Sequence, residues 1–171
     1  MRTVGRVVLL VATAGGLYPP VSAAERLCDT VVGLLATVFV GGVPNSQLAR
    51  VEMRQCSPEL SATIQLAAWR SGDVTPALVV DTSDFGIVQA AARKNVFIVE
   101  TSGGPRDQVF VIVYNRGEPK LALRRVTKGT ALINISASAV DLIIEGIYAG
   151  DLPPRTESQH FALDLGEMRP R

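Results

Sequence analysis

Short apolar runs separated by turn residues fill the chain from Val96 to Tyr148, and this alternation constrains the fold more than any other feature of the sequence. The segments between the runs are rich in Gly, Pro, Asn and Ser, which favour tight turns. They are too brief for the crossover of a dozen or more residues that parallel pairing requires. The sequence therefore predicts antiparallel strands at Val96–Thr101, Val109–Tyr114, Lys120–Thr127, Thr130–Ser136 and Val140–Tyr148.

The sequence before Val96 also predicts mainly strands. Apolar and polar residues alternate in Arg50–Cys56 and Thr63–Trp69, as expected for half-buried strands. A short apolar strand is predicted at Ala77–Val80, after a proline. Leu27–Val40 is apolar with many β-branched residues and fits either a helix or a strand.

One segment favours a short helix near residues 84–94. Thr82–Asp84 offers side-chain oxygens for an N-cap, and Arg93–Lys94 places positive charge at the expected C-terminal end. Asn95 is suited to the left-handed residue that often ends a helix. The predicted fold class is therefore α+β, predominantly antiparallel β in a meander or sandwich, with this one helix.

The same periodicities predict the core. Strand residues that share the apolar face, together with one residue of the predicted helix, should be buried. These are Val51, Met53, Ile64, Leu66, Val79, Val88, Ile98, Val111, Val113, Leu121, Leu123, Ile133, Ile135, Leu142 and Ile144.

The two predicted strands on either side of the turn at Asn115–Pro119 differ in polarity. Val109–Tyr114 is apolar throughout, which is typical of a strand covered on both faces. Lys120–Thr127 has leucines alternating with basic residues, so we expect it nearer an edge or an exposed face.

Residues 1–24 are typical of a cleaved signal peptide. Arg2 and Arg6 precede an apolar run, and small residues follow in the segment before Glu25, where the mature chain should begin. The alternative is an uncleaved membrane anchor, which we disfavour because the run is shorter than the ~20 residues needed to span a bilayer. We expect an exported protein, periplasmic or secreted, with no membrane span in the mature chain.

The remaining sequence predicts a single β-rich globular domain at residues 25–150, a common domain size. Residues 151–171 form a C-terminal tail that is either mobile or contributes an edge strand.

The chain has two cysteines, Cys28 and Cys56, and both would meet an oxidising compartment after export. We therefore predict a disulfide between them, worth roughly 3 kcal/mol in the chain-entropy description. A reactive thiol is disfavoured, because neither cysteine belongs to a Cys-x-x-Cys pair or has a histidine near it in the sequence.

Charge and aromatic content argue against nucleic acid as a partner. The chain has 17 basic and 16 acidic residues, so no general positive field attracts phosphates. Aromatic residues make up 5% of the chain, which leaves few stacking platforms for bases.

Catalytic signals are weak. His160 is the only histidine, so a Ser-His-Asp triad would depend on it, and no Gly-x-Ser-x-Gly elbow accompanies it. We predict no metal site and no cofactor, since zinc ligands are not clustered and glycine-rich phosphate motifs are missing. Asp81 and Asp84 form the best carboxylate pair, and helix capping is favoured over ligand binding for them.

Positive charge is concentrated in one place. Period-two geometry puts Lys120, Arg124 and Lys128 on one side of a strand, opposite Leu121 and Leu123. Such a stripe could bind an anionic polysaccharide, lipid headgroup or acidic protein. We favour a solvated face, because lysines on edge strands discourage association.

The leading functional hypothesis is an exported, non-catalytic structural or interaction module that binds an unknown protein or envelope component through a sheet face or loop. One alternative is an exported hydrolase with a carboxylate site around Asp81 and Asp84. Another is an exported inhibitor that presents the loop Gly41–Ser46.

Overall fold

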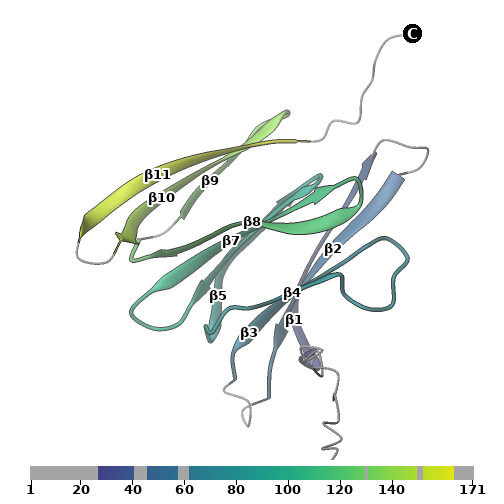
Figure 1. The fold of residues 1–171 in the computed structure, drawn as a ribbon, viewed down its shortest axis with the longest axis horizontal. Coiled ribbons are helices and arrows are strands. Elements are labelled where there is room, and N and C mark those ends of the chain that lie inside the picture. The colour runs from purple at the N-terminus through teal and green to yellow at the C-terminus, as the bar shows by residue number, and fades with distance from the viewer. Residues whose placement is uncertain (1–26, 41–45, 58–61, 130, 150–151, 164–171) are drawn as a thin grey trace, which may run out of the picture.

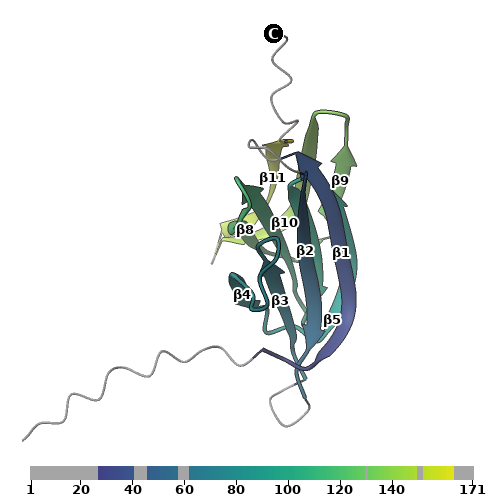
Figure 2. The ribbon, with the colours of Figure 1, turned by 90° about the vertical axis from the view of Figure 1, so that its right-hand side faces the viewer.

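A computed structural model describes residues 27–40, 46–57, 62–129, 131–149 and 152–163. The described residues form strands in two antiparallel sheets, which Figures 1 and 2 show from two directions. The predominantly antiparallel β prediction is thus confirmed, and all predicted strands are present with small shifts of their ends.

The first sheet, sheet A, has four strands in the order of the sequence. They are β1 (Thr30–Val40), β2 (Ser46–Gln55), β3 (Ile64–Trp69) and β4 (Leu78–Asp81). In Figure 2 this sheet faces the viewer, with β1 at its outer edge. The segment from Leu27 to Val40, for which the sequence left helix and strand open, is therefore mostly strand.

The second sheet, sheet B, has seven strands. They are β5 (Gly86–Arg93), β6 (Val96–Ser102), β7 (Asp107–Asn115), β8 (Glu118–Thr127), β9 (Ala131–Ile135), β10 (Ala139–Ala149) and β11 (Leu152–Ala162). The order is β11-β10-β8-β7-β6-β5, and β9 pairs with β10. The sheet curls back on itself, so that the backbone N–H of Ala131 in β9 donates to the Glu100 carboxylate of β6 at 3.1 Å.

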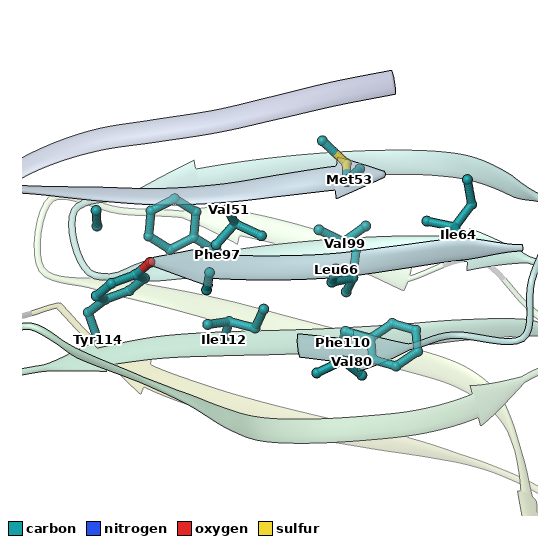
Figure 3. Close-up of a cluster of buried hydrophobic side chains, with 12 residues drawn as sticks. Val51, Met53, Ile64, Leu66, Val80, Phe97, Val99, Phe110, Ile112 and Tyr114 are labelled. Carbon is teal, nitrogen blue, oxygen red and sulfur yellow. The ribbon is translucent and has the colours of Figure 1, made fainter. Parts of the chain in front are cut away.

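One core fills the space between the two sheets (Figure 3). Sheet A contributes alternate residues of β2 and β3, and sheet B contributes alternate residues of β6 and β7. The buried members are Ala49, Val51, Met53, Ile64, Leu66, Ala68, Val80, Phe97, Val99, Phe110, Ile112 and Tyr114.

A second core lies inside the curl of sheet B. It uses the opposite faces of β6 and β7, together with residues of β8, β9 and β10 and Leu163. Its buried members are Val96, Ile98, Val109, Val111, Leu123, Ala131, Val140, Leu142, Ile144, Ile147 and Leu163. Strands β6 and β7 are thus covered on both faces, as predicted for Val109–Tyr114.

The predicted helix near residues 84–94 is wrong. Gly86–Arg93 is strand β5, which pairs antiparallel with β6. A short segment gains little from intrinsic helix propensity, whereas here the neighbouring strand supplies backbone partners. The turn at Lys94 and Asn95, with Lys94 at φ 50°, is a hairpin turn and not a helix end.

Three residues of the predicted core are exposed. Val88 belongs to the strand that replaces the helix and is 46% exposed. Leu121 precedes a bulge that changes which face it occupies, and Ile135 lies at the end of β9. Of the others, Val79, Val113 and Ile133 are partly buried, and the remaining nine are buried.

The hairpin of β7 and β8 closes through Arg116 and Gly117, which both have positive φ. That is the geometry of a type I′ turn, whose twist matches that of the flanking strands. β8 is paired along its length with β7 but meets β10 in register only at Thr127. Part of the predicted tail, Leu152–Ala162, belongs to sheet B as β11.

Candidate functional site

The outer face of sheet A carries an unusual set of exposed apolar side chains. Val31, Leu34 and Val38 of β1 and Leu48 of β2 are 47%, 57%, 66% and 49% exposed. Val38 and Leu48 are direct cross-strand partners. We call these four residues the apolar strip.

The strip follows from a strand that is apolar on both faces. Leu35 pairs with Val51 and packs against the inter-sheet core, so its neighbours Leu34 and Ala36 face outward. In an ordinary half-exposed strand those outward positions would be polar. The apolar outward positions explain why the sequence pattern of this segment fits no single period.

The free edge of β1 adjoins the strip. In the part of the chain that the structure describes, β1 pairs with β2 and with no other strand. No charged residue occurs in the sequence between Asp29 and Arg50. The side chains of β1 are therefore uncharged, and near its C-terminal end the Thr37 hydroxyl donates to the carbonyl of Lys94, which follows β5.

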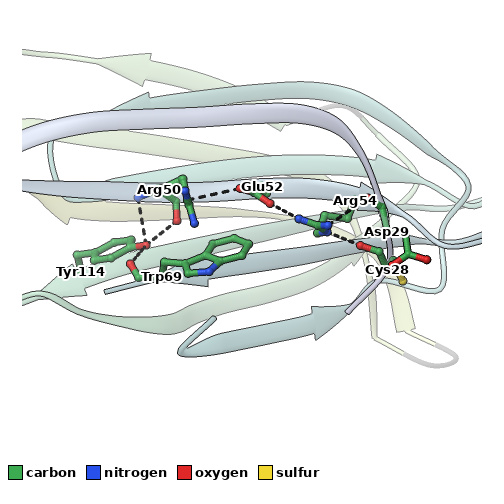
Figure 4. Close-up of polar contacts among 7 residues, drawn as sticks. All are labelled: Cys28, Asp29, Arg50, Glu52, Arg54, Trp69 and Tyr114. Carbon is green, nitrogen blue, oxygen red and sulfur yellow. Dashed lines mark hydrogen bonds and ion pairs between the residues drawn. The ribbon is translucent and has the colours of Figure 1, made fainter. Parts of the chain in front are cut away.

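A ladder of charged residues continues the same face along β2 (Figure 4). Arg50 and Arg54 both form ion pairs with Glu52, which lies between them. The Arg50 guanidinium lies over the Trp69 ring, with Cζ 4.3 Å from the ring centroid. The arrangement covers the Trp69 ring, which is 4% exposed as a residue, so Trp69 offers no open stacking platform.

Arg54 also anchors the chain just before β1 (Figure 4). Its Nε donates to the carbonyl of Cys28, and its Nη2 donates to the carbonyl of Asp29 at 3.1 Å. The Cys28–Cys56 disulfide joins the same point to the residue after β2, with Cα atoms 4.6 Å apart. The predicted disulfide is thus present and holds one end of β1 in place.

A shallow hollow of about 180 Å³ lies beside the strip. Its lining is Leu48, Arg50, Trp69, Arg70, Ser71, Gly72 and Asp73. The Arg70 Nε donates to both carboxylate oxygens of Glu118 at 2.8 Å, and this hydrogen bond to Glu118 is the main cause of the raised pKa of Arg70. Ligand pockets are usually ~300 Å³ or larger, so this hollow is better suited to a protruding side chain.

The structure does not bring Asp81 and Asp84 into one site. Asp81 is exposed and accepts a hydrogen bond from Gln65 at 2.9 Å. Asp84 is 4% exposed, between the sheets, and accepts from Thr101 and from Gln108, the latter at 2.9 Å. Each carboxylate is thus held by neighbouring amide or hydroxyl groups, and neither lines the hollow.

The helix-capping role predicted for these carboxylates is wrong, because no helix follows them. Asp84 instead sits where the chain passes from sheet A to sheet B. Its backbone carbonyl accepts from Ile64 N–H of β3 at 2.6 Å, and the next residue, Phe85, donates to the carbonyl of Ser102 in β6 at 2.9 Å. Asp84 therefore connects the two sheets through backbone and side chain.

The predicted basic stripe does not form on one face. The β7–β8 register shifts between Val111 and Ile112, so that β8 holds one extra residue. Lys120 pairs with Val113, while Arg124 pairs with Phe110, whose side chain points into the other core. Lys120 and Arg124 therefore lie on opposite faces of β8.

Arg124 and Lys128 have contacts within the protein. The Arg124 Nε donates to Gln108 at 3.0 Å, and its guanidinium lies 5.3 Å from the Phe110 ring centroid. Through Gln108 it is linked to the buried carboxylate of Asp84. The backbone N–H of Lys128, whose side chain is exposed, donates to Gly146 at 3.1 Å.

His160 lies on β11, opposite Asp141 of β10, and its Nδ1 is 2.7 Å from an Asp141 carboxylate oxygen. Both side chains are more than half exposed. Of the loop Gly41–Ser46, residues 41–45 lie outside the described part of the chain.

Sequence reasoning missed the apolar strip and the buried carboxylate Glu100, which is 0% exposed and bonded to Gln89 and Ala131. A signal for the strip was present in the uncharged stretch from Thr30 to Ala49. No comparable signal marks Glu100, because its burial depends on the curl of sheet B.

No protein-family model, no curated protein and no solved structure matches this chain. Among the described residues, no helix has the length and apolar character needed to cross a membrane.

Proposed function

We propose that this protein is an exported, non-catalytic interaction module that binds an extended segment of a partner protein along β1. The observation that carries the proposal is the coincidence of an apolar strip and a free strand edge on the same element. Main-chain hydrogen bonds to such an edge supply affinity, and alternate side chains packing on the adjoining face supply specificity.

The surroundings of β1 support this role. The disulfide and Arg54 hold the chain at the start of β1, so the edge is preorganised and β1 loses less conformational entropy on binding. The hollow next to Leu48 lies where a side chain of an added segment could dock. Export is supported by the predicted leader and is compatible with the disulfide, which would persist in an oxidising compartment.

The proposal can be tested with an array of short peptides at high protein dilution. The mature protein should bind uncharged peptides of alternating β-branched and polar residues, and peptides with charges at the alternating positions should bind weakly. Leu34→Lys places a charge in the centre of the strip and should weaken binding roughly 10-fold or more.

The matched control is Leu132→Lys. Leu132 of β9 is 51% exposed, close to the 57% of Leu34, but lies on the other sheet. It should bind peptides as the unmodified protein does. Equal binding by the Leu34→Lys protein, or no binding of any peptide by the monomer, would contradict the proposal.

A further inference from the structure

The exposed edges of the two sheets are not alike. β4 has only four residues and ends in Asp81. β11 has prolines at its second and third positions and carries Arg155 and Glu157. β5 is interrupted by a bulge at Val88 and ends in Arg93. Short length, proline, charge and bulges are the features that prevent strands from pairing with other chains.

β1 has few of these protections. It is 11 residues long and contains neither proline nor a charged residue. Its one bulge, at Val32, lies near its start and leaves a regular stretch from Gly33 onward. Because β4, β5 and β11 are protected in these ways, the long uncharged edge of β1 sets it apart from these three edge strands.

We propose that the occupant of this edge is a second copy of the same chain, whose β1 pairs antiparallel with the first. This inference rests on the proposed function, since it names the partner of the same surface. The paired strands would join the two A sheets into one continuous sheet. The apolar strips of the two copies would then lie side by side on its outer face, each covering part of the other.

The distribution of charge favours a second copy as the partner and antiparallel pairing of the two β1 strands. The residues of β1 carry no charge, so the paired strands do not repel each other. The charges lie at its ends: Asp29 precedes β1, and Thr37 donates to the carbonyl of Lys94, which brings Arg93 and Lys94 to the other end. Antiparallel pairing places the acidic end of each copy toward the basic end of its partner, whereas parallel pairing would bring like charges together.

The symmetry limits the assembly to a dimer. Two antiparallel copies are related by a twofold axis through the paired strands, and this contact uses the same surface of both chains. The other edge of β1 is already paired with β2, so no further chain can add at β1 once two copies have met. The protected edges of β4, β5 and β11 do not extend the assembly.

Sedimentation equilibrium and hydrogen exchange of the oxidised mature protein test the inference together. The unmodified protein should sediment with twice the mass of one chain, and its β1 amides should become more protected as concentration rises. Leu34→Lys should raise the dimer dissociation constant roughly 10-fold or more. Val38→Lys, at a residue 66% exposed, is a second variant with the same expected effect.

Leu132→Lys serves as the control and should remain a dimer. A monomeric unmodified protein, a dimer that persists in both β1 variants, or a dimer whose β1 amides gain no protection would overturn the inference. If the protein is monomeric but binds the peptides described above, only the identity of the partner is wrong. If it is monomeric and binds no peptide, the proposed function fails as well.

Discussion

At the residue scale, the two sheets are joined by a few buried polar side chains. Tyr114 reaches from β7 to sheet A, where its hydroxyl oxygen lies 2.8 Å from the Arg50 carbonyl and 2.9 Å from the Trp69 carbonyl. Asp84 makes the corresponding contact at the other end of the interface through Thr101 and Gln108. A buried polar group left without a partner costs about 1–3 kcal/mol, so these residues help to fix the mutual position of the sheets.

Tyr114 should make stability fall at alkaline pH. Burial disfavours the phenolate and raises the pKa of Tyr114 from 10.0 to about 12. Because the raised pKa means that the folded state holds the proton more tightly, this stabilisation is complete below pH 10 and is lost as pH rises toward 12. Urea unfolding at neutral pH and within this window measures the loss.

The control for this prediction is Tyr114→Phe. It should be less stable at neutral pH by about 1–3 kcal/mol, since the backbone groups of Arg50 and Trp69 lose a partner. Its stability should also fall less at alkaline pH, because it has no phenol group at this position to ionise. An identical pH profile in both proteins would show that other groups cause the loss.

Gly103 should be intolerant of a side chain, because a Cβ atom there would lie 2.5 Å from an Asp84 carboxylate oxygen. The hydrogen bonds from Thr101 and Gln108 prevent that carboxylate from moving away freely. Gly103→Ala should therefore lower the free energy of unfolding by about 1–3 kcal/mol. Gly86→Ala is the control, since a Cβ there meets no atom within 4 Å, and thermal unfolding should separate the two variants.

At the element scale, β8 and β11 are linked across β10 by a side-chain pair. Arg125 of β8 donates to both oxygens of Glu157 in β11, at 3.2 and 3.1 Å. The two strands thus have a connection besides the backbone pairing of each with β10. This connection holds the outer strand of sheet B and depends on the charge of Glu157.

The link should loosen in acid. The hydrogen bond from Arg125 is the main cause of the lowered pKa of Glu157, whose ordinary value is 4.5. A lowered pKa in the folded state gives stability that is present above that ordinary value and is lost as pH falls below it. As the pH falls below 4.5, the rate of amide hydrogen exchange in β11 should rise after correction for the intrinsic exchange rates. The Glu157→Gln variant should show little of this pH dependence. A β11 response that is unchanged in this variant would rule out the pair as its cause.

At the scale of the whole molecule, the disulfide closes the β1–β2 hairpin. Cys28 and Cys56 are 28 residues apart and flank the two strands. Replacing both by serine should lower the free energy of unfolding by roughly 3 kcal/mol, because the unfolded chain regains the freedom of that loop. Denaturant unfolding of the oxidised protein and the double variant measures the difference, and equal stabilities would contradict it.

The sequence predicted the strands well where turn residues bracket an apolar run, as at Arg116–Gly117. It failed at Gly86–Arg93, where caps and charges suit a helix but the neighbouring β6 supplies hydrogen-bond partners. It also failed at the basic stripe, because a bulge in β8 changes the side-chain period and period-two reasoning assumes a regular strand.

The sequence alone determined the strand pairs joined by short turns and the cysteine pair, because these depend on residues close in the chain or on chemistry that few residues possess. Tertiary structure decided which faces are covered. Glu100 of β6 is buried because sheet B curls and brings β9 against it. Leu34 is exposed because β1 lies at the edge of sheet A. Burial depends on neighbours that are distant in sequence, so the apolar strip and the open edge of β1 became visible only in the folded chain.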